Sequence, residues 1–217
     1  LLASGGLAQA IGRPVSNWFP ISPLDASEPD EVNSAVAYNS WWQEYLVVWV
    51  WYTSEESYIY GQFVSRNGTL IGPRFLISGF TGSSVQPHVA YNPDRNEYLV
   101  VYAFSSPSGR GIYGQRLDAF GTAIGAQLIF ASSATDRYWN PAVAYATNSS
   151  AYLVVWERDQ PTGSRGIQFS ISGVEARSLT GDGATMSTIL AVTGMLAYLE
   201  PEMPDVAYTH ASDEFLV

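Results

Sequence analysis

Apolar and polar residues alternate in blocks along this chain, and one such block recurs four times. Each copy joins a Val-Ala-Tyr segment, a polar turn and a continuous apolar run, as in residues 36–49 (V-A-Y-N-S-W-W-Q-E-Y-L-V-V-W). The other copies begin at residues 89, 143 and 206. A short run that is apolar on successive residues predicts a strand covered on both faces by neighbouring sheets.

Two further segments extend the repeated unit. Residues 60–68 (Y-G-Q-F-V-S-R-N-G) match residues 113–121 (Y-G-Q-R-L-D-A-F-G), and both are followed by Ile-Gly and a short apolar segment. Each unit therefore predicts four strands with polar turns between them. The starting residues Tyr38, Tyr91 and Tyr145 are 53 and 54 positions apart, and a period near 50 is typical of propellers and solenoids.

This pattern resembles the propeller-type tandem repeats of bacterial secreted and surface proteins, over about residues 11–217. The resemblance implies a β-propeller on a secreted or cell-surface protein, and hence an extracellular or cell-surface location. It does not specify an activity, because such repeats occur on proteins of many kinds.

We predict an all-β fold, a β-propeller of four blades with four antiparallel strands each, in which the two termini share one blade. The alternatives are a fragment of a larger propeller, or half-blades that complete each other between chains. The predicted parts are a signal-peptide remnant or hairpin arm (1–10), the outer strand of the shared blade with a linker (11–31), three blades (32–79, 85–132 and 140–193), and the first strands of the shared blade (204–217).

Charge and composition exclude several classes of partner. The chain has 217 residues with 20 acidic and 10 basic side chains, a net charge of −10 that disfavours nucleic acid. It has no cysteine, so neither a disulfide framework nor a thiolate metal site can form. No apolar run is long enough to span a bilayer, and we expect no membrane insertion.

Catalytic signatures are scarce in the sequence. The two histidines, His88 and His210, have no carboxylate at a metal-ligand spacing. Glu44, Glu97 and Glu214 recur at one repeat position, and this recurrence favours a structural role. We therefore predict that the chain is not an enzyme. A hydrolase with carboxylates around a central channel is the weakest alternative.

Carboxylates gather in two connections that would flank the shared blade of a closed ring. An oxygen-only cluster of this kind suits Ca²⁺, although a solvated acidic rim is the simpler interpretation. The candidate calcium ligands are Asp25, Glu28, Asp30, Glu31, Glu200, Glu202 and Asp205.

Aromatic residues at predicted turns are the remaining signal. Trp41 and Trp42 stand at a hairpin tip where the other units have Asp94-Arg95, Asn148-Ser149 and Ala211-Ser212. Tyr138 and Trp139 precede the third unit. These four residues are candidate contacts for a protein partner or a sugar. Trp49 and Trp156, at a repeated strand position, are expected in the core. Asn67 and Asn148 match the N-glycosylation sequon.

We thus predict a non-catalytic extracellular module that mediates protein–protein contacts, self-assembly or assembly of a surface structure. The main alternative is a carbohydrate-binding, lectin-like propeller that uses the exposed aromatic residues. A glycoside hydrolase-like enzyme is the weaker alternative. No cofactor is predicted apart from the candidate calcium ion.

Overall fold

The computed structural model describes residues 21, 31–79, 82–162, 169–193, 196–197 and 203–217. These residues form fifteen strands and no helix, so the predicted all-β fold is confirmed. Within these ranges there is accordingly no helix that is long and apolar enough to cross a membrane.

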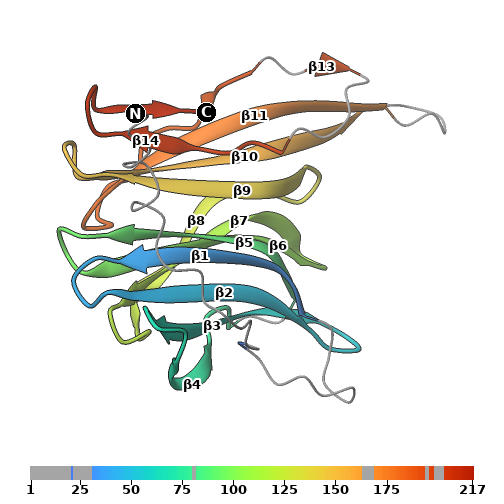
Figure 1. The fold of residues 1–217 in the computed structure, drawn as a ribbon. Helices are drawn as coiled ribbons and strands as arrows, with labels where there is room; N and C mark the ends of the chain where they lie inside the picture. The colour runs from blue at the N-terminus through green and yellow to red at the C-terminus, as the bar shows by residue number, and fades with distance from the viewer. Residues whose placement is uncertain (1–20, 22–30, 80–81, 163–168, 194–195, 198–202) are drawn as a thin grey trace, which may run out of the picture.

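The strands form successive antiparallel units along the chain (Figure 1). The first unit consists of β1 (Glu31–Asn39), β2 (Glu44–Tyr52), β3 (Ser57–Ser65) and β4 (Leu70–Leu76). The second unit consists of β5 (Ser83–Asn92), β6 (Glu97–Ser106), β7 (Gly109–Asp118) and β8 (Ala123–Ser133). One parallel pairing, between Ser57 of β3 and Ser83 of β5, joins the two units into one sheet.

The third unit has the same order but shorter outer strands. It consists of β9 (Arg137–Ala146), β10 (Ala151–Thr162) and β11 (Phe169–Thr180), with the two-residue strands β12 (Leu190–Ala191) and β13 (Leu196–Ala197) beside β11. A separate hairpin, β14 (Ala207–Thr209) and β15 (Glu214–Leu216), begins the last unit. In Figure 1 this hairpin lies next to β9, β10 and β11.

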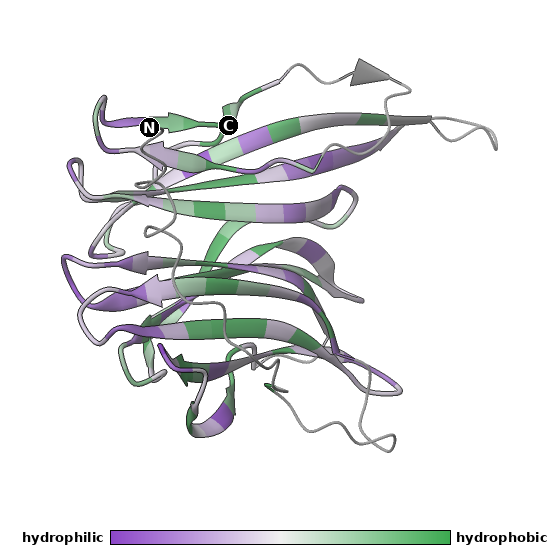
Figure 2. Cartoon of the chain, in the orientation of Figure 1, coloured by the Kyte–Doolittle hydropathy of each residue, from purple (hydrophilic) through white to green (hydrophobic). Residues whose placement is uncertain are grey.

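The hydrophobic core lies between successive units. Figure 2 shows hydrophobic residues in the middle of the strands and hydrophilic residues toward the turns. Leu46 and Val48 of the first unit share one buried cluster with Val100 of the second. Leu99 of the second unit likewise packs with Trp156 of the third. The second strand of a unit thus faces a neighbour on both sides, which explains its continuous apolar run.

Each of the first three units has an irregularity in its first strand. Asn33, Gln86 and Asn140 occupy the same repeat position and have left-handed backbone angles, with φ of 52°, 54° and 48°. The pairing register with the second strand shifts beside each of them. These residues are β-bulges that increase the local twist of the strand.

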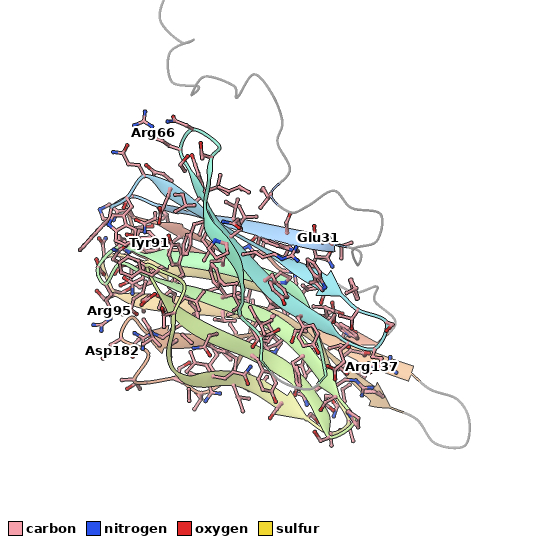
Figure 3. All side chains as sticks on the ribbon, turned by 90° about the horizontal axis from the view of Figure 1, so that it is seen from below. Glu31, Arg66, Tyr91, Arg95, Arg137 and Asp182 are labelled. Carbon is pink, nitrogen blue, oxygen red and sulfur yellow. The ribbon has the colours of Figure 1, made fainter. Side chains whose placement is uncertain are left out.

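The two ends of the units differ. Turns that follow β1, β3, β5, β7, β9 and β11 lie at one end, called here the hairpin-tip end. In Figure 3, Arg66, Arg95 and Asp182 mark this end, whereas Glu31 and Arg137 lie at the opposite end. The hairpin-tip end carries Trp41 and Trp42.

The sheets do not form a closed ring among the described residues, so the number of blades is not shown. The predicted outer strand of the shared blade, residues 11–31, lies outside the described residues apart from Ile21 and Glu31. The predicted signal remnant, residues 1–10, lies outside them entirely.

Candidate functional site

The tip between β1 and β2 presents two tryptophans to solvent. Asn39, which is fully buried, accepts hydrogen bonds at its Oδ1 from the backbone N–H groups of Trp41 (2.9 Å) and Trp42 (3.1 Å). This arrangement fixes the turn through the asparagine side chain rather than through the tryptophans. Trp41 and Trp42 are 61% and 44% exposed. The predicted exposure of both side chains is confirmed.

A second aromatic residue, Phe120, reaches this tip from the turn between β7 and β8. The carboxylate of Asp118 accepts hydrogen bonds from the backbone of Phe120 (2.9 Å) and Thr122 (2.8 Å). Gly121 has a φ of 85°, and a methyl group there would lie 2.6 Å from the Phe75 ring of the first unit. The turn therefore packs directly against the first unit, and Phe120 stays 74% exposed.

Trp42 and Phe120 meet across the boundary between the first two units. Their ring centroids are 4.9 Å apart and the rings are inclined by 58°. Both residues line a cavity of about 410 Å³, called here the Trp42–Phe120 groove. Its lining residues are Trp42, Glu44, Phe63, Ile71, Gly72, Pro73, Phe75, Ala119, Phe120, Gly121 and Thr122.

The carboxylate of this groove differs from its counterpart in the next unit. Glu97 of the second unit forms ion pairs with Arg116 and with Arg95. Glu44 stands at the same repeat position, but Phe63 takes the place of Arg116. Within the described part of the chain, no hydrogen bond or ion pair joins the Glu44 side chain. Burial raises its pKa above the ordinary value of 4.5.

Three departures from the repeat therefore converge on one cavity. Trp42 replaces a polar tip residue. Phe120 stands where the turns of the first and third units have Asn67 and Asp182. Phe63 stands where the second unit has Arg116 and the third has Ser178. The sequence identified Trp42 but not Phe120, which an alignment of the β3–β4, β7–β8 and β11 turns would have found. The lack of an ion pair at Glu44 depends on contacts between strands and has no signal in such an alignment.

The other predicted aromatic contacts do not join this groove. Tyr138 is buried in the core between the second and third units, and Trp139 is half-buried at the opposite end of the molecule. Tyr138 is therefore not available to a ligand. Trp49 and Trp156 are buried as expected, and their indole N–H groups donate to Glu31 and Glu175, each at 3.1 Å.

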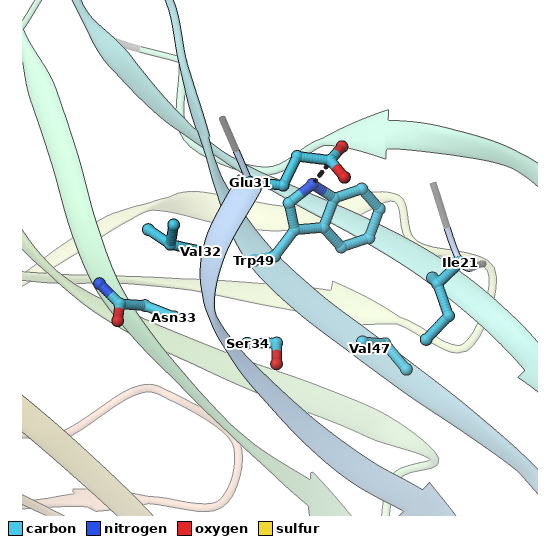
Figure 4. A pocket seen from close by; sticks show the side chains of 7 residues that line it. All are labelled: Ile21, Glu31, Val32, Asn33, Ser34, Val47 and Trp49. Atoms are coloured by element: carbon cyan, nitrogen blue, oxygen red, sulfur yellow. Dashed lines mark hydrogen bonds between the residues drawn. The ribbon is translucent and has the colours of Figure 1, made fainter. Parts of the chain in front are cut away.

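A smaller cavity of about 190 Å³ lies beside Trp49 (Figure 4). It is lined by Ile21, Val32, Asn33 and other residues of β1 and β2. The carboxylate of Glu31 is engaged here with the indole of Trp49, as the dashed line shows.

The predicted calcium site is mostly outside the described residues, since only Glu31 and Asp205 of the seven candidates are described. Glu31 accepts the Trp49 indole, and Asp205 accepts the backbone N–H of Val206. Among the residues that the structure covers, no group of three His, Asp or Glu side chains is placed to hold a metal ion. The calcium site stays a prediction.

Both sequon asparagines lie in exposed turns. Asn67 follows β3. Asn148 follows β9, and its side-chain amide donates to the carbonyl of His210 at 3.0 Å. A glycan on Asn148 would have to break this contact with the last hairpin. Glycosylation at either position stays a prediction.

No protein-family model matches the chain, and no curated protein sequence is similar to it. Solved structures are similar in fold. An N-acetylgalactosamine deacetylase from F. plautii, in complex with blood group B trisaccharide, is 10% identical with a TM-score of 0.53, over 94% of this chain and 60% of that chain. The Hadza microbial sialidase Hz136 is 11% identical with a TM-score of 0.50, over 72% of this chain and 36% of that chain.

The chain thus spans between about a third and three fifths of the length of these two proteins. At such low identity the similarity concerns the fold, and it supports the β-propeller architecture predicted from the repeat.

Two predictions are wrong on this comparison. The sequence predicted a non-catalytic module for protein–protein contacts or surface assembly, and predicted that the chain is not an enzyme. The two structures named above are instead carbohydrate-active enzymes by name, so the comparison favours the carbohydrate-binding alternative. The error arose because the repeated residues are those that build the blades, and such residues carry no information about catalysis.

Proposed function

We propose that this chain is the propeller part of a carbohydrate-active protein and that the Trp42–Phe120 groove binds a glycan. The observation that carries the proposal is a cavity lined by two exposed aromatic residues in ring contact and by a glutamate. The apolar face of a sugar ring packs against aromatic faces, and its hydroxyl groups need polar partners.

The size and composition of the groove suit this role. A volume of about 410 Å³ lies within the range of small-ligand pockets, which are mostly apolar with a few polar groups. Here the apolar wall comes from Phe63, Phe75 and Pro73, and the polar groups include Glu44 and Thr122. The groove lies between two units that share a buried hydrophobic cluster, and the structure shows it formed without a ligand.

The test is a glycan array followed by titration of each bound glycan with three variants. Trp42→Ala and Phe120→Asn should each weaken binding about tenfold or more, because each removes one aromatic face. Phe120→Asn restores the turn residue of the first unit, Asn67, so folding should be preserved. Trp41→Ala is the matched control, since Trp41 is exposed beside the groove but does not line it.

Silence of the wild-type protein across the array, or binding that neither groove variant weakens, would refute the proposal. The same incubations should be assayed for released sugar and released acetate, because hydrolysis or deacetylation would extend the proposal from binding to catalysis.

We also propose that the last unit completes a four-blade ring by packing against the first. Val36 is 59% exposed, whereas its counterparts Val89, Val143 and Val206 are each buried against the preceding unit. Ala37 shares a core cluster with Val89, as Ala90 does with Val143. In each case the alanine of one unit packs with the valine of the next unit. If the last unit packs against the first, the exposed Ala207 would face Val36 in the same way.

The variant Val36→Cys/Ala207→Cys tests this closure, because the chain has no native cysteine. Oxidation should give a cross-linked monomer in dilute solution. Disulfide-linked oligomers would instead indicate pairing between chains, and the absence of any cross-link would contradict the four-blade count.

A further inference from the structure

The proposed function gives Glu44 a place in the groove but does not say which ligands its carboxylate selects. Glu44 is only 7% exposed, and it lines the cavity beside Trp42 and Phe63. An ionised carboxylate offers about four acceptor positions. Among the described residues no protein group donates to the Glu44 carboxylate, and its oxygens are not among the buried polar atoms that lack a partner, so they stay accessible in the groove. The second unit shows that the fold can supply such donors, because Arg116 and Arg95 pair with Glu97.

The replacement of Arg116 by Phe63 has two effects at once. It removes the cation that would neutralise the carboxylate, and it keeps the volume of the groove open. In the second unit the guanidinium of Arg116 also donates to the carbonyl of Asp182 in the neighbouring turn. A methyl group at Gly183 of that turn would lie 2.5 Å from the guanidinium. In the second unit, the space that corresponds to the groove is therefore filled.

The sign of the local charge restricts what can enter. The residues that line the groove include Glu44 but no lysine, arginine or histidine. The chain as a whole carries a net charge of −10. An acidic sugar would therefore bring a second negative charge next to an unpaired carboxylate in a partly desolvated site, where like charges repel strongly. Hydroxyl groups of a neutral sugar are donors and meet no such repulsion.

We infer that Glu44 determines the ligand class of the groove: a neutral glycan whose hydroxyl groups donate to the Glu44 carboxylate while its ring packs against Trp42 and Phe120. Sialic acid and uronic acid residues are excluded from this position. The inference rests on the proposed function, since it assigns the carbohydrate class of the same groove. Glu44 acts here as a specificity-determining residue that touches the ligand.

The experiment compares neutral oligosaccharides with uronic acid oligosaccharides of the same length, for the wild type and two variants. The wild type should bind the neutral series at least tenfold more tightly. Glu44→Gln keeps the size and removes the charge, so it should weaken neutral binding about tenfold and reduce the preference over the acidic series. Phe63→Arg introduces the residue that the second unit has at this position, Arg116. The new arginine should form an ion pair with Glu44 and fill the groove, which should abolish binding of both series.

A measurement without ligand separates a binding role from a structural one. Glu97→Gln should lower the melting temperature because it breaks a buried ion pair, whereas Glu44→Gln should leave it unchanged or raise it. The circular dichroism spectrum of Phe63→Arg confirms that this variant folds.

Three binding results would overturn the inference: equal affinity for the neutral and acidic series, neutral binding that Glu44→Gln does not change, and binding that is confined to amine-bearing sugars and lost in high salt. A Glu44→Gln variant whose melting temperature falls as much as that of Glu97→Gln would overturn it as well. If the wild type binds no sugar of either series, the proposed function itself fails. If it binds sugars without regard to Glu44, only this inference fails.

Discussion

Glu44 and Glu97 occupy the same repeat position, yet their surroundings give them different physical roles. Glu97 lies between two arginines and holds the second unit against the turn of the third. Glu44 lines a cavity, and no arginine or histidine of the described residues forms an ion pair with it. A repeated residue type therefore does not imply a repeated role, because the role depends on the partner that the neighbouring strand supplies.

Breaking the Glu97 ion pair should be costly. The Glu97→Gln substitution leaves the guanidinium of Arg116 buried without its charge partner, and such losses typically destabilise a protein by about 3 kcal/mol. Urea denaturation of wild type and variant measures the difference. The Arg95→Ala variant is the control, since Arg95 is exposed and should contribute about 1 kcal/mol or less. A cost for Glu97→Gln no greater than for Arg95→Ala would contradict the structural role.

His88 should make the stability of the fold sensitive to mild acid. Burial lowers its pKa below the ordinary 6.5, an effect that the nearby Asp205 charge opposes in part, and its Nδ1 accepts the Val143 backbone N–H at 3.2 Å. The folded state thus favours the neutral imidazole. This contribution to stability is present above pH 6.5 and declines as the pH falls below it.

Denaturation midpoints measured between pH 7.5 and 5.5 test the role of His88. The wild type should lose more stability over this range than His88→Gln, which cannot titrate. Parallel pH profiles for the two proteins would show that the imidazole is not buried in its neutral form.

These residue-level features were only partly predictable. The exposure of Trp41 and Trp42 followed from their place at a turn, and the burial of Trp49 and Trp156 followed from a repeated strand position. The burial of Tyr138 was not predicted, because it depends on how the third unit packs against the second. The same holds for the groove, whose walls come from residues more than 70 positions apart.

At the scale of elements, the asparagine at the end of the first strand shapes the hairpin tips. Asn39 and Asn92 each accept two backbone N–H groups of the turn that follows. Asn39 also donates to the side chain of Asn96 in the second unit at 3.0 Å. The tip that carries Trp42 is therefore fixed both internally and to its neighbour.

Removing this asparagine should loosen one tip and not the fold of the sheet. Asn39→Ala is expected to cost about 2 kcal/mol, since it leaves two turn N–H groups without their acceptor. It should also weaken glycan binding, because Trp42 loses its fixed position. Asn92→Ala is the matched control, which should destabilise the protein similarly but leave glycan affinity unchanged. Equal effects of both variants on affinity would show that tip geometry does not control the groove.

The strand order of the units was predictable because the turn residues and the continuous apolar runs recur at a regular spacing. The bulges at Asn33, Gln86 and Asn140 were not, because a register shift depends on pairing between strands and leaves no fixed signature in one sequence. The outer strands of the third unit were also shorter than a strict repeat implies.

At the scale of the whole molecule, each unit buries its own surface against the next. The first unit presents Val36, Tyr38 and Tyr45 on an exposed face whose counterparts in the later copies are buried or half-buried. The last hairpin presents Ala207 and Leu216 on the opposite face. The two faces are complementary, because residues at the same repeat positions pack against each other between successive units. This complementarity underlies the proposed ring, and the groove between the first two units does not depend on it.

The most direct measurement of the central claim is an NMR titration of the indole N–H signals with a neutral oligosaccharide. Binding in the Trp42–Phe120 groove should shift the signal of Trp42 in a saturable way. The signals of Trp49 and Trp156 should stay in place, because these indoles are buried and hydrogen-bonded to Glu31 and Glu175. A Trp42 signal that does not move at millimolar concentrations of any neutral oligosaccharide bound by the protein would contradict the account.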